Sequence, residues 1–182
     1  MAKVLLPLAD GCEELEAVTI IDVLRRAEIE VVAAGLTEGP VRASRGVTLV
    51  ADTTLDAARA RGGFDAVVLP GGMGGTHALA ADARVAALLK ELAAAGKTVA
   101  AICAAPLVLA KAGLLTGRRF TAYPGVLKDA DAGGAQTGAA VEADGNVVTS
   151  RGPGTATDFA LTLVELLRNR KTREEVESGL VR

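Results

Sequence analysis

The stretch KTVAAICAAPLVLAKAGLL, residues 97–115, places one cysteine between two patterns of different period. Residues 98–102 are continuously apolar, which is typical of a strand buried on both faces. Residues 105–115 carry apolar side chains at helical spacing. Cys103 therefore stands at a strand-to-helix junction, where a side chain projects from a sharp turn in the manner of a catalytic nucleophile.

Strand and helix patterns alternate through the rest of the chain. Strands are predicted at 3–8, 29–35, 64–70, 98–102 and 146–150, and helices at 13–27, 81–97, 105–115 and 155–170. This alternation predicts an α/β fold with a mostly parallel sheet covered by helices on both faces. Residues 37–56 and 118–146 are less regular and favour short hairpins or edge strands. The length of 182 residues predicts a single domain over 1–182.

Composition excludes several function classes. The net charge is −2 and no basic stripe or aromatic platform is present, so nucleic-acid binding is not expected. One histidine and two cysteines cannot build a histidine-rich zinc site, a paired-cysteine zinc site or a disulfide framework, and no metal is expected. The first apolar run is short and contains Pro7, and no window is long enough to span a membrane. We expect a cytoplasmic protein with reduced thiols.

Four loops should share one edge of the sheet. In an open parallel sheet, ligands bind outside the carboxyl ends of the strands. That rule selects residues 9–16, the PGGMGG loop at 70–75, Cys103 itself, and residues 150–155. Thr155 and Asp158 also suggest a capping box at the start of the last helix. The candidate site is the edge at which these loops meet.

Cys103 has two interpretations on position alone. A helix N-terminus favours negative charge, so it should lower the pKa of the thiol and favour the thiolate. A free cysteine is equally common as a buried, inert filler of the core. Cys12 lies on the same edge without a strand-to-helix junction, and the filler interpretation is favoured for it.

Glu16, on the first predicted helix, is a candidate for a carboxyl group that stays protonated. Its helical neighbours Cys12, Thr19, Ile20 and Val23 are uncharged, and Glu13 is the exception. A carboxyl held among apolar groups tends to stay protonated, and it could then donate a hydrogen bond to the Cys103 thiolate. The alternative is a carboxylate that complements the helix dipole, and spacing alone does not decide between them.

The glycine-rich loop at 70–75 matches neither the dinucleotide fingerprint nor a P-loop. Its glycines would let backbone N–H groups approach a reacting oxygen, as in an oxyanion hole, or would simply form a tight turn. His77 follows this loop, and a surface or capping role is favoured for it over catalysis.

Four motifs together resemble the ThiJ/PfpI superfamily. They are GCEELEAV at 11–18, VLPGG at 68–72, AICAAP at 101–106 and SRGPGTATDFAL at 150–161, and they occur in the order of that family. The resemblance covers residues 3–168. It is closest to the branch that holds the human Parkinson-disease deglycase and the bacterial YajL chaperone.

The resemblance implies a flavodoxin-like α/β sandwich without a cofactor. It implies that Cys103 is the reactive nucleophile and that Glu16 is the protonated carboxyl bonded to it. It also implies that the backbone N–H groups of Gly71, Gly72 and Ala104 bind an oxyanion.

The resemblance further implies a homodimer. Arg45 matches an arginine that approaches the cysteine pocket across the dimer interface in relatives, and Arg26 matches an interface arginine. The first helix is apolar at 17, 18, 20, 21, 23 and 24, which is more than one buried face requires and independently suits a dimer.

Two departures concern the general base. Tyr123, in FTAYPGVLKD, occupies the place of a histidine in the human deglycase, although the YajL type also has an aromatic residue there. Ala104 occupies the place of the histidine that follows the nucleophile in the proteolytic branch. The sequence thus makes protease activity the least expected of the family's activities.

Three functions are carried forward. The first is a cysteine enzyme acting on small reactive aldehydes or glycated side chains, of the glyoxalase III or protein deglycase type. The second is a redox-sensing stress chaperone in which Cys103 is oxidised to a sulfinate stabilised by Glu16. The third is a cysteine peptidase or amidase, for which His77 would have to approach Cys103.

Overall fold

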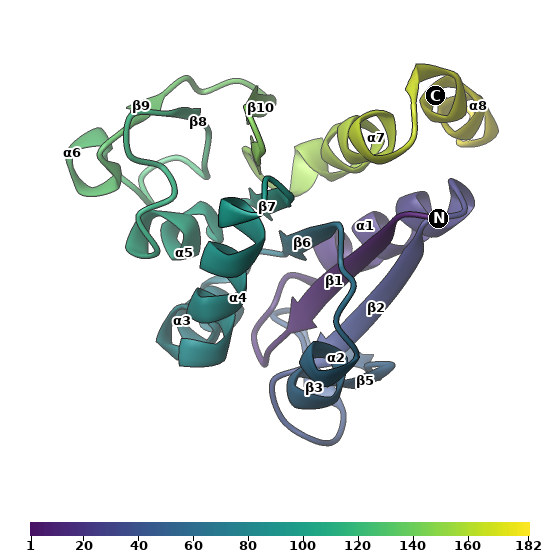
Figure 1. The fold of residues 1–182 in the computed structure, drawn as a ribbon, viewed down its shortest axis with the longest axis horizontal. Helices are drawn as coiled ribbons and strands as arrows, with labels where there is room; N and C mark the ends of the chain where they lie inside the picture. Colours follow the sequence, from purple (N-terminus) through teal and green to yellow (C-terminus); the bar gives the residue numbers. More distant parts are fainter.

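A seven-stranded sheet forms the centre of the computed structural model, which describes residues 1–182 (Figure 1). Its order is β10-β11-β7-β6-β1-β2-β5. The strands are β1 (Lys3–Leu8), β2 (Glu30–Gly35), β5 (Thr53–Thr54), β6 (Ala66–Leu69), β7 (Thr98–Ile102), β10 (Val141–Asp144) and β11 (Val147–Ser150). Every pairing is parallel except that of β10 with β11. The mostly parallel sheet predicted from the sequence is therefore confirmed, and the long strands follow the flavodoxin-like order.

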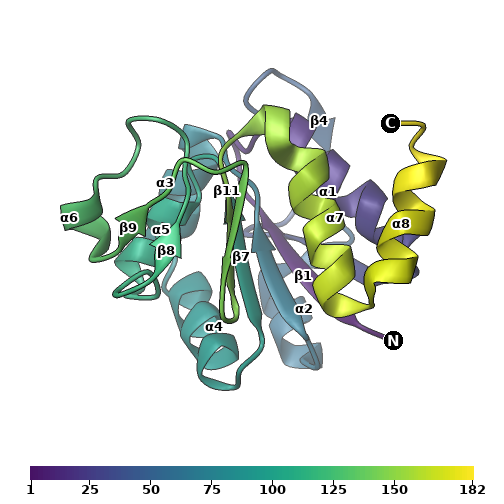
Figure 2. The ribbon, with the colours of Figure 1, turned by 90° about the horizontal axis from the view of Figure 1, so that it is seen from above.

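Helices cover both faces of this sheet (Figures 1 and 2). One face carries α1 (Glu14–Arg26) and α7 (Ala156–Leu167), with α8 (Arg170–Gly179) packed against α7. The other face carries α2 (Leu55–Arg61), α3 (Met73–Ala81), α4 (Ala83–Ala94) and α5 (Pro106–Lys111). The continuous apolar strands follow from this arrangement: Val4 and Leu6 of β1 pack on the side of α1, and Leu5 packs on the opposite side.

The irregular segments form small structures outside the sheet. Strands β3 (Val41–Arg42) and β4 (Thr48–Leu49) make an antiparallel hairpin, while β8 (Arg119–Phe120) and β9 (Ala135–Gln136) pair in parallel. A short helix α6 (Asp129–Ala132) precedes β9. The predicted last helix is wrong in one respect, because the chain breaks at Arg168 and continues as α8.

The predicted capping box at Thr155 and Asp158 is also wrong. Pro153–Thr155 form a 3₁₀ turn before α7. In this turn the Thr155 hydroxyl forms hydrogen bonds with Ser150 and Gly152. The Thr155 side chain therefore does not cap the N-terminus of α7. Asp158 instead pairs with Arg182 at 2.6 Å, which ties the C-terminal residue to α7.

Candidate active site

The four predicted loops meet at the carboxyl edge of the sheet around a cavity of about 680 Å³. Residues from all four loops contribute to its wall. The hairpin β3–β4 and the segment after β8 add the remainder, so the wall consists of Gly11, Glu13, Ser44, Arg45, Gly72, Met73, Gly74, Cys103, Ala104, Tyr123, Pro124, Gly125, Val126 and Pro153. The sequence therefore located the edge correctly, but the predicted loops did not include Ser44 or the residues Pro124, Gly125 and Val126, which also line the cavity.

Cys103 adopts a left-handed backbone conformation, with φ at +63°. This conformation is uncommon for a residue other than glycine and costs conformational energy. Two backbone hydrogen bonds hold it: the N–H of Cys103 donates to the Ser150 carbonyl at 2.9 Å, and its carbonyl accepts from the N–H of Tyr123 at 2.8 Å. The neighbouring strand and the Tyr123 segment thus fix a strained turn that presents the thiol to the cavity.

Glu16 lies fully buried on α1 beside that thiol. The N–H of Gly71 donates to its Oε2 at 2.7 Å. Its Oε1 is buried and has no hydrogen bond of good geometry. A Cβ at Gly71 would lie 2.7 Å from the Cβ of Cys103 and 2.8 Å from Oε2 of Glu16, so only glycine lets these two side chains meet.

Burial raises the pKa of Glu16 from its ordinary value of 4.5 to about 7. The hydrogen bonds from Gly71 and Cys103 act against this rise, and the nearby charge of Glu13 adds to it. The expectation of a carboxyl that keeps its proton well above the ordinary range agrees with this direction.

The thiol of Cys103 does not follow the simple helix-dipole expectation. Burial raises its pKa, and a charge on Glu16 would raise the pKa further. The N–H groups of Gly72 and Ala104 lower it, as expected of a helix start, but they do not set the net direction. The predicted lowering by the helix N-terminus alone is therefore wrong, and the thiol depends on the protonation of its neighbour.

The geometry indicates where one negative charge would reside. An ionised Glu16 would leave Oε1 as a buried carboxylate oxygen without a partner, which is costly. A protonated Glu16 can instead donate to the sulfur of Cys103, with which its side chain shares a hydrogen bond, and the sulfur then has the N–H groups of Gly72 and Ala104 as further partners. We therefore expect the reactive form to pair a protonated Glu16 with a Cys103 thiolate.

The glycine loop has divided roles. The N–H of Gly71 donates to Glu16, so it holds the carboxyl group in place. The predicted role of Gly71 as an oxyanion donor is therefore wrong. Gly72 has φ at +82°, and a Cβ there would collide with the backbone of Gly11 and Glu13. Gly72 and Ala104 face the sulfur with their N–H groups and remain the candidate oxyanion donors.

The other predicted residues fall into two groups. Arg45 and the half-exposed Tyr123 line the cavity of their own chain, and the Tyr123 ring packs against Gly152. His77 is exposed on α3 and does not line the cavity. Cys12 is fully buried, and burial raises its pKa to about 11, which agrees with a filler role.

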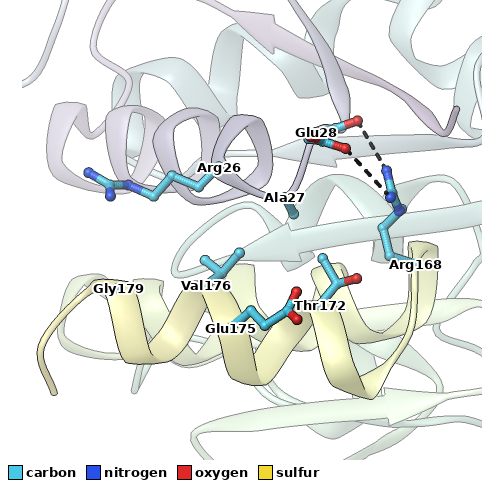
Figure 3. A pocket seen from close by; sticks show the side chains of 8 residues that line it. All are labelled: Arg26, Ala27, Glu28, Arg168, Thr172, Glu175, Val176 and Gly179. Atoms are coloured by element: carbon cyan, nitrogen blue, oxygen red, sulfur yellow. Dashed lines mark hydrogen bonds and ion pairs between the residues drawn. The ribbon is translucent and has the colours of Figure 1, made fainter.

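Arg26 lies far along α1 beside a second groove of about 420 Å³ between α1 and α8 (Figure 3). The groove's charged groups are paired. Arg26 bonds to Asp22 at 2.7 Å, and Arg168 reaches the Glu28 carbonyl at 3.3 Å. This groove offers no free charge for a ligand.

No group of three histidine, cysteine, aspartate or glutamate side chains is arranged to hold a metal ion. None of the helices is long and apolar enough to span a membrane.

Comparisons with known proteins agree with the fold and the motifs. Residues 2–166 match the model of the DJ-1/PfpI family. The chain is 45% identical to Protein dj-1beta of Drosophila melanogaster over 96% of this chain and 94% of that protein. It superimposes on the crystal structure of that protein with a TM-score of 0.92, covering 99% of this chain and 97% of the other.

Two further relatives carry informative names. The glutathione-independent glyoxalase DJR-1.2 of Caenorhabditis elegans is 36% identical over 91% of this chain and 88% of its own length. A structure of oxidized Toxoplasma gondii DJ-1 is 39% identical with a TM-score of 0.92, covering 100% of this chain and 98% of that one.

Burial of Glu16 predicts a specific pH dependence of stability, best measured in a Cys103→Ala background where the carboxyl titrates without the thiol. Below pH 4.5 the carboxyl is protonated in both the folded and the unfolded chain. Between pH 4.5 and about 7 the unfolded chain loses the proton while the folded chain keeps it, so the free energy of unfolding falls as pH rises. The expected loss is about 3 kcal/mol.

Urea denaturation of Cys103→Ala and of Cys103→Ala with Glu16→Gln, from pH 4 to 8, measures this loss. The double variant should lack it, because glutamine does not titrate. A difference between the two variants that stays constant over this range would show that Glu16 ionises normally in the folded protein.

Proposed function

Because the chain belongs to the DJ-1/PfpI family, we propose that it is a cofactor-independent cysteine enzyme that acts on reactive carbonyl compounds. One observation carries this proposal. A buried carboxyl with an unpartnered oxygen lies beside a strained cysteine at the wall of a 680 Å³ cavity. The name of the Caenorhabditis elegans glyoxalase supports the same class of substrate.

The proposed first step is addition of the Cys103 thiolate to the aldehyde carbon of methylglyoxal. A C–S bond forms, and the carbonyl electrons move to oxygen. The N–H groups of Gly72 and Ala104 surround the sulfur and are placed to stabilise the oxyanion that develops next to it. Glu16 then supplies the proton that completes the hemithioacetal, because its raised pKa keeps a proton available near neutral pH.

The second step moves a proton between the two carbons of the bound substrate. The carboxylate of Glu16, having given up its proton, removes the hydrogen from the carbon bonded to sulfur while the ketone oxygen takes up a proton, which gives an enediol. A proton is then delivered to the neighbouring carbon, and the hydroxyl on the carbon bonded to sulfur loses its proton as the thioester carbonyl forms. The product is a lactoyl thioester of Cys103, and water releases lactate and the free thiol. The aldehyde carbon is oxidised and the ketone carbon is reduced within one molecule, so no external oxidant is required.

A glycated side chain is the alternative substrate. The cavity is larger than a small aldehyde needs, and its Tyr123 wall is half exposed, so an adduct still attached to an amine could enter. The same thiolate attack would then release the amine. Protein deglycase activity is thus a variant of the same proposed chemistry.

A redox role is the second candidate. Cys103 is 9% exposed and lines the cavity, so a small oxidant such as hydrogen peroxide could reach it. Protonated Glu16 would donate a hydrogen bond to a sulfinate oxygen, and the oxidized relative from Toxoplasma gondii supports this candidate. A peptidase or amidase is not supported, because His77 is exposed on α3 and outside the cavity wall.

A homodimer is proposed from an apolar surface that the single chain leaves open. Leu15 and Val18 of α1 are 52% and 49% exposed, and Val47 and Val50 of the hairpin region are 48% and 83% exposed. The hairpin lies close to the start of α1, because the N–H of Val47 donates to the carboxylate of Glu14, the residue before Leu15. A second copy of the chain would cover this surface.

We further propose a cytoplasmic location, where the two free thiols stay reduced.

Lactate formation from methylglyoxal tests the proposed enzyme. The purified protein should form lactate catalytically in the presence of a chelator, and Cys103→Ala should lower the turnover by roughly 10³-fold or more because it removes the nucleophile. Full activity in that variant would contradict the mechanism. No turnover in the wild type, together with rapid oxidation of Cys103 by peroxide, would favour the redox role instead.

Light scattering coupled to size-exclusion chromatography tests the dimer. Leu15→Glu combined with Val18→Glu should convert a dimer into a monomer, because charges would be buried without partners. Leu166→Glu is a matched control, since Leu166 is 51% exposed but lies on α7. A wild-type monomer, or equal dissociation by the control, would count against the proposed surface.

A further inference from the structure

The side chain of Glu14 forms hydrogen bonds with the turn Ser44–Val47, which is the tip of the hairpin between β3 and β4. Its Oε1 accepts from the N–H of Arg45 at 2.9 Å and from the N–H of Val47 at 3.4 Å. Its Oε2 accepts from the hydroxyl of Ser44 at 3.0 Å. Glu14 is only 9% exposed, although it stands in the first turn of α1. A single carboxylate thus binds three of the four residues of the turn Ser44–Val47.

The turn that Glu14 holds forms part of the cavity wall. Ser44 and Arg45 both line the cavity that contains Cys103. The hydroxyl of Ser44 also lies 2.9 Å from the carboxylate of Glu13, which lines the same cavity. The base of the hairpin has its own anchors, because the N–H of Ser44 donates to the Cys12 carbonyl and Gly11 donates to the Arg42 carbonyl, both at 2.8 Å. Loss of Glu14 should therefore loosen the tip while the base stays attached.

Arg45 makes no ion pair within the chain, in contrast to Arg25, Arg26 and Arg84. Arg45 lines the cavity without an ion-pair partner in its own chain, and the turn held by Glu14 determines where its backbone lies. Burial alone would raise the pKa of Glu14, but its own backbone N–H, the Ser44 hydroxyl, and the N–H groups of Val47 and Arg45 hold the pKa below its ordinary value. Glu14 is therefore a charged acceptor, and such hydrogen bonds are stronger than neutral ones.

We propose that Glu14 is a positioning residue that acts through the turn Ser44–Val47 to place the guanidinium of Arg45 at the cavity wall, where it favours entry of negatively charged reactants. The three acidic residues at the start of α1 then have separate tasks. Glu16 contacts the reactive sulfur, Glu13 lines the cavity, and Glu14 fixes the part of the wall that the hairpin turn forms.

Alkylation of Cys103 tests this placement without any assumption about carbonyl turnover. The ratio of the rate with iodoacetate to the rate with iodoacetamide, measured at one pH, reports the electrostatic field at the sulfur. Glu14→Ala should lower this ratio about three- to fivefold because Arg45 loses its fixed position. Removal of a nearby negative charge would by itself raise the ratio, so the direction separates positioning from a direct charge effect.

Three variants make the test decisive. Arg45→Ala should lower the ratio by a similar factor, and Glu14→Ala combined with Arg45→Ala should lower it no further, because both changes remove one effect. Glu174→Ala, which removes an exposed carboxylate on α8, serves as the surface control. An unchanged or increased ratio in Glu14→Ala, or additive effects in the double variant, would overturn the proposal.

Limited digestion with trypsin supplies an independent readout of the turn. Cleavage after Arg45 should be about tenfold faster in Glu14→Ala than in the wild type, since the turn loses its charged acceptor. Equal cleavage rates would show that Glu14 does not hold the tip. Neither measurement requires lactate formation, so failure of the proposed enzyme activity and failure of this proposal remain distinguishable.

Discussion

The burial of one carboxyl group against one sulfur atom is the constraint on which this site depends. Glu16 has no access to water, and the N–H of Gly71 satisfies only one of its oxygens. Its partner, Cys103, is held in a left-handed conformation by two backbone hydrogen bonds. Neither side chain can move away without leaving a polar atom unpartnered or releasing the turn. Because burial raises the pKa of both groups, the pair keeps its protons to higher pH than two isolated groups would, and the two groups titrate together.

The fold supplies this arrangement through the edge of the sheet. Helix α1 follows β1 and brings Glu16 from one loop, while Gly71 follows β6 and Cys103 follows β7. These strands are neighbours in the parallel sheet, so their carboxyl ends bring the three residues together. The hairpin β3–β4 closes the cavity from outside the sheet, and Glu14 connects it to the same helix start. One short segment, residues 13–16, thus organises both the reactive centre and its wall.

The sequence predicted those parts of the site that local pattern encodes. A continuous apolar strand ahead of Cys103, and uncharged helical neighbours around Glu16, made these two residues candidates, and the family resemblance assigned them as the reactive pair. The hairpin tip carries no such pattern: Ser44 and Arg45 reach the cavity through contacts with residues 30 positions away, as the bond from Ser44 to Glu14 shows. The sign of the thiol shift was also beyond local reasoning, because burial and a nearby carboxyl outweigh the helix start. Likewise, the 3₁₀ turn at Pro153–Thr155 redirected a side chain that sequence spacing assigned to a cap.

The claim that Glu16 holds the proton while Cys103 holds the charge can be tested most directly by the alkylation rate of Cys103 with iodoacetamide at pH 7. Glu16→Gln and Glu16→Leu are the informative variants, because glutamine keeps a hydrogen-bond donor and leucine has none at similar volume. The account predicts a rate near that of the wild type for Glu16→Gln and a clearly lower rate for Glu16→Leu, because in the latter variant the Cys103 thiolate loses its hydrogen-bond donor. A higher rate for leucine would contradict the account, since it would mean that Glu16 is ionised in the native protein and had been suppressing the thiolate.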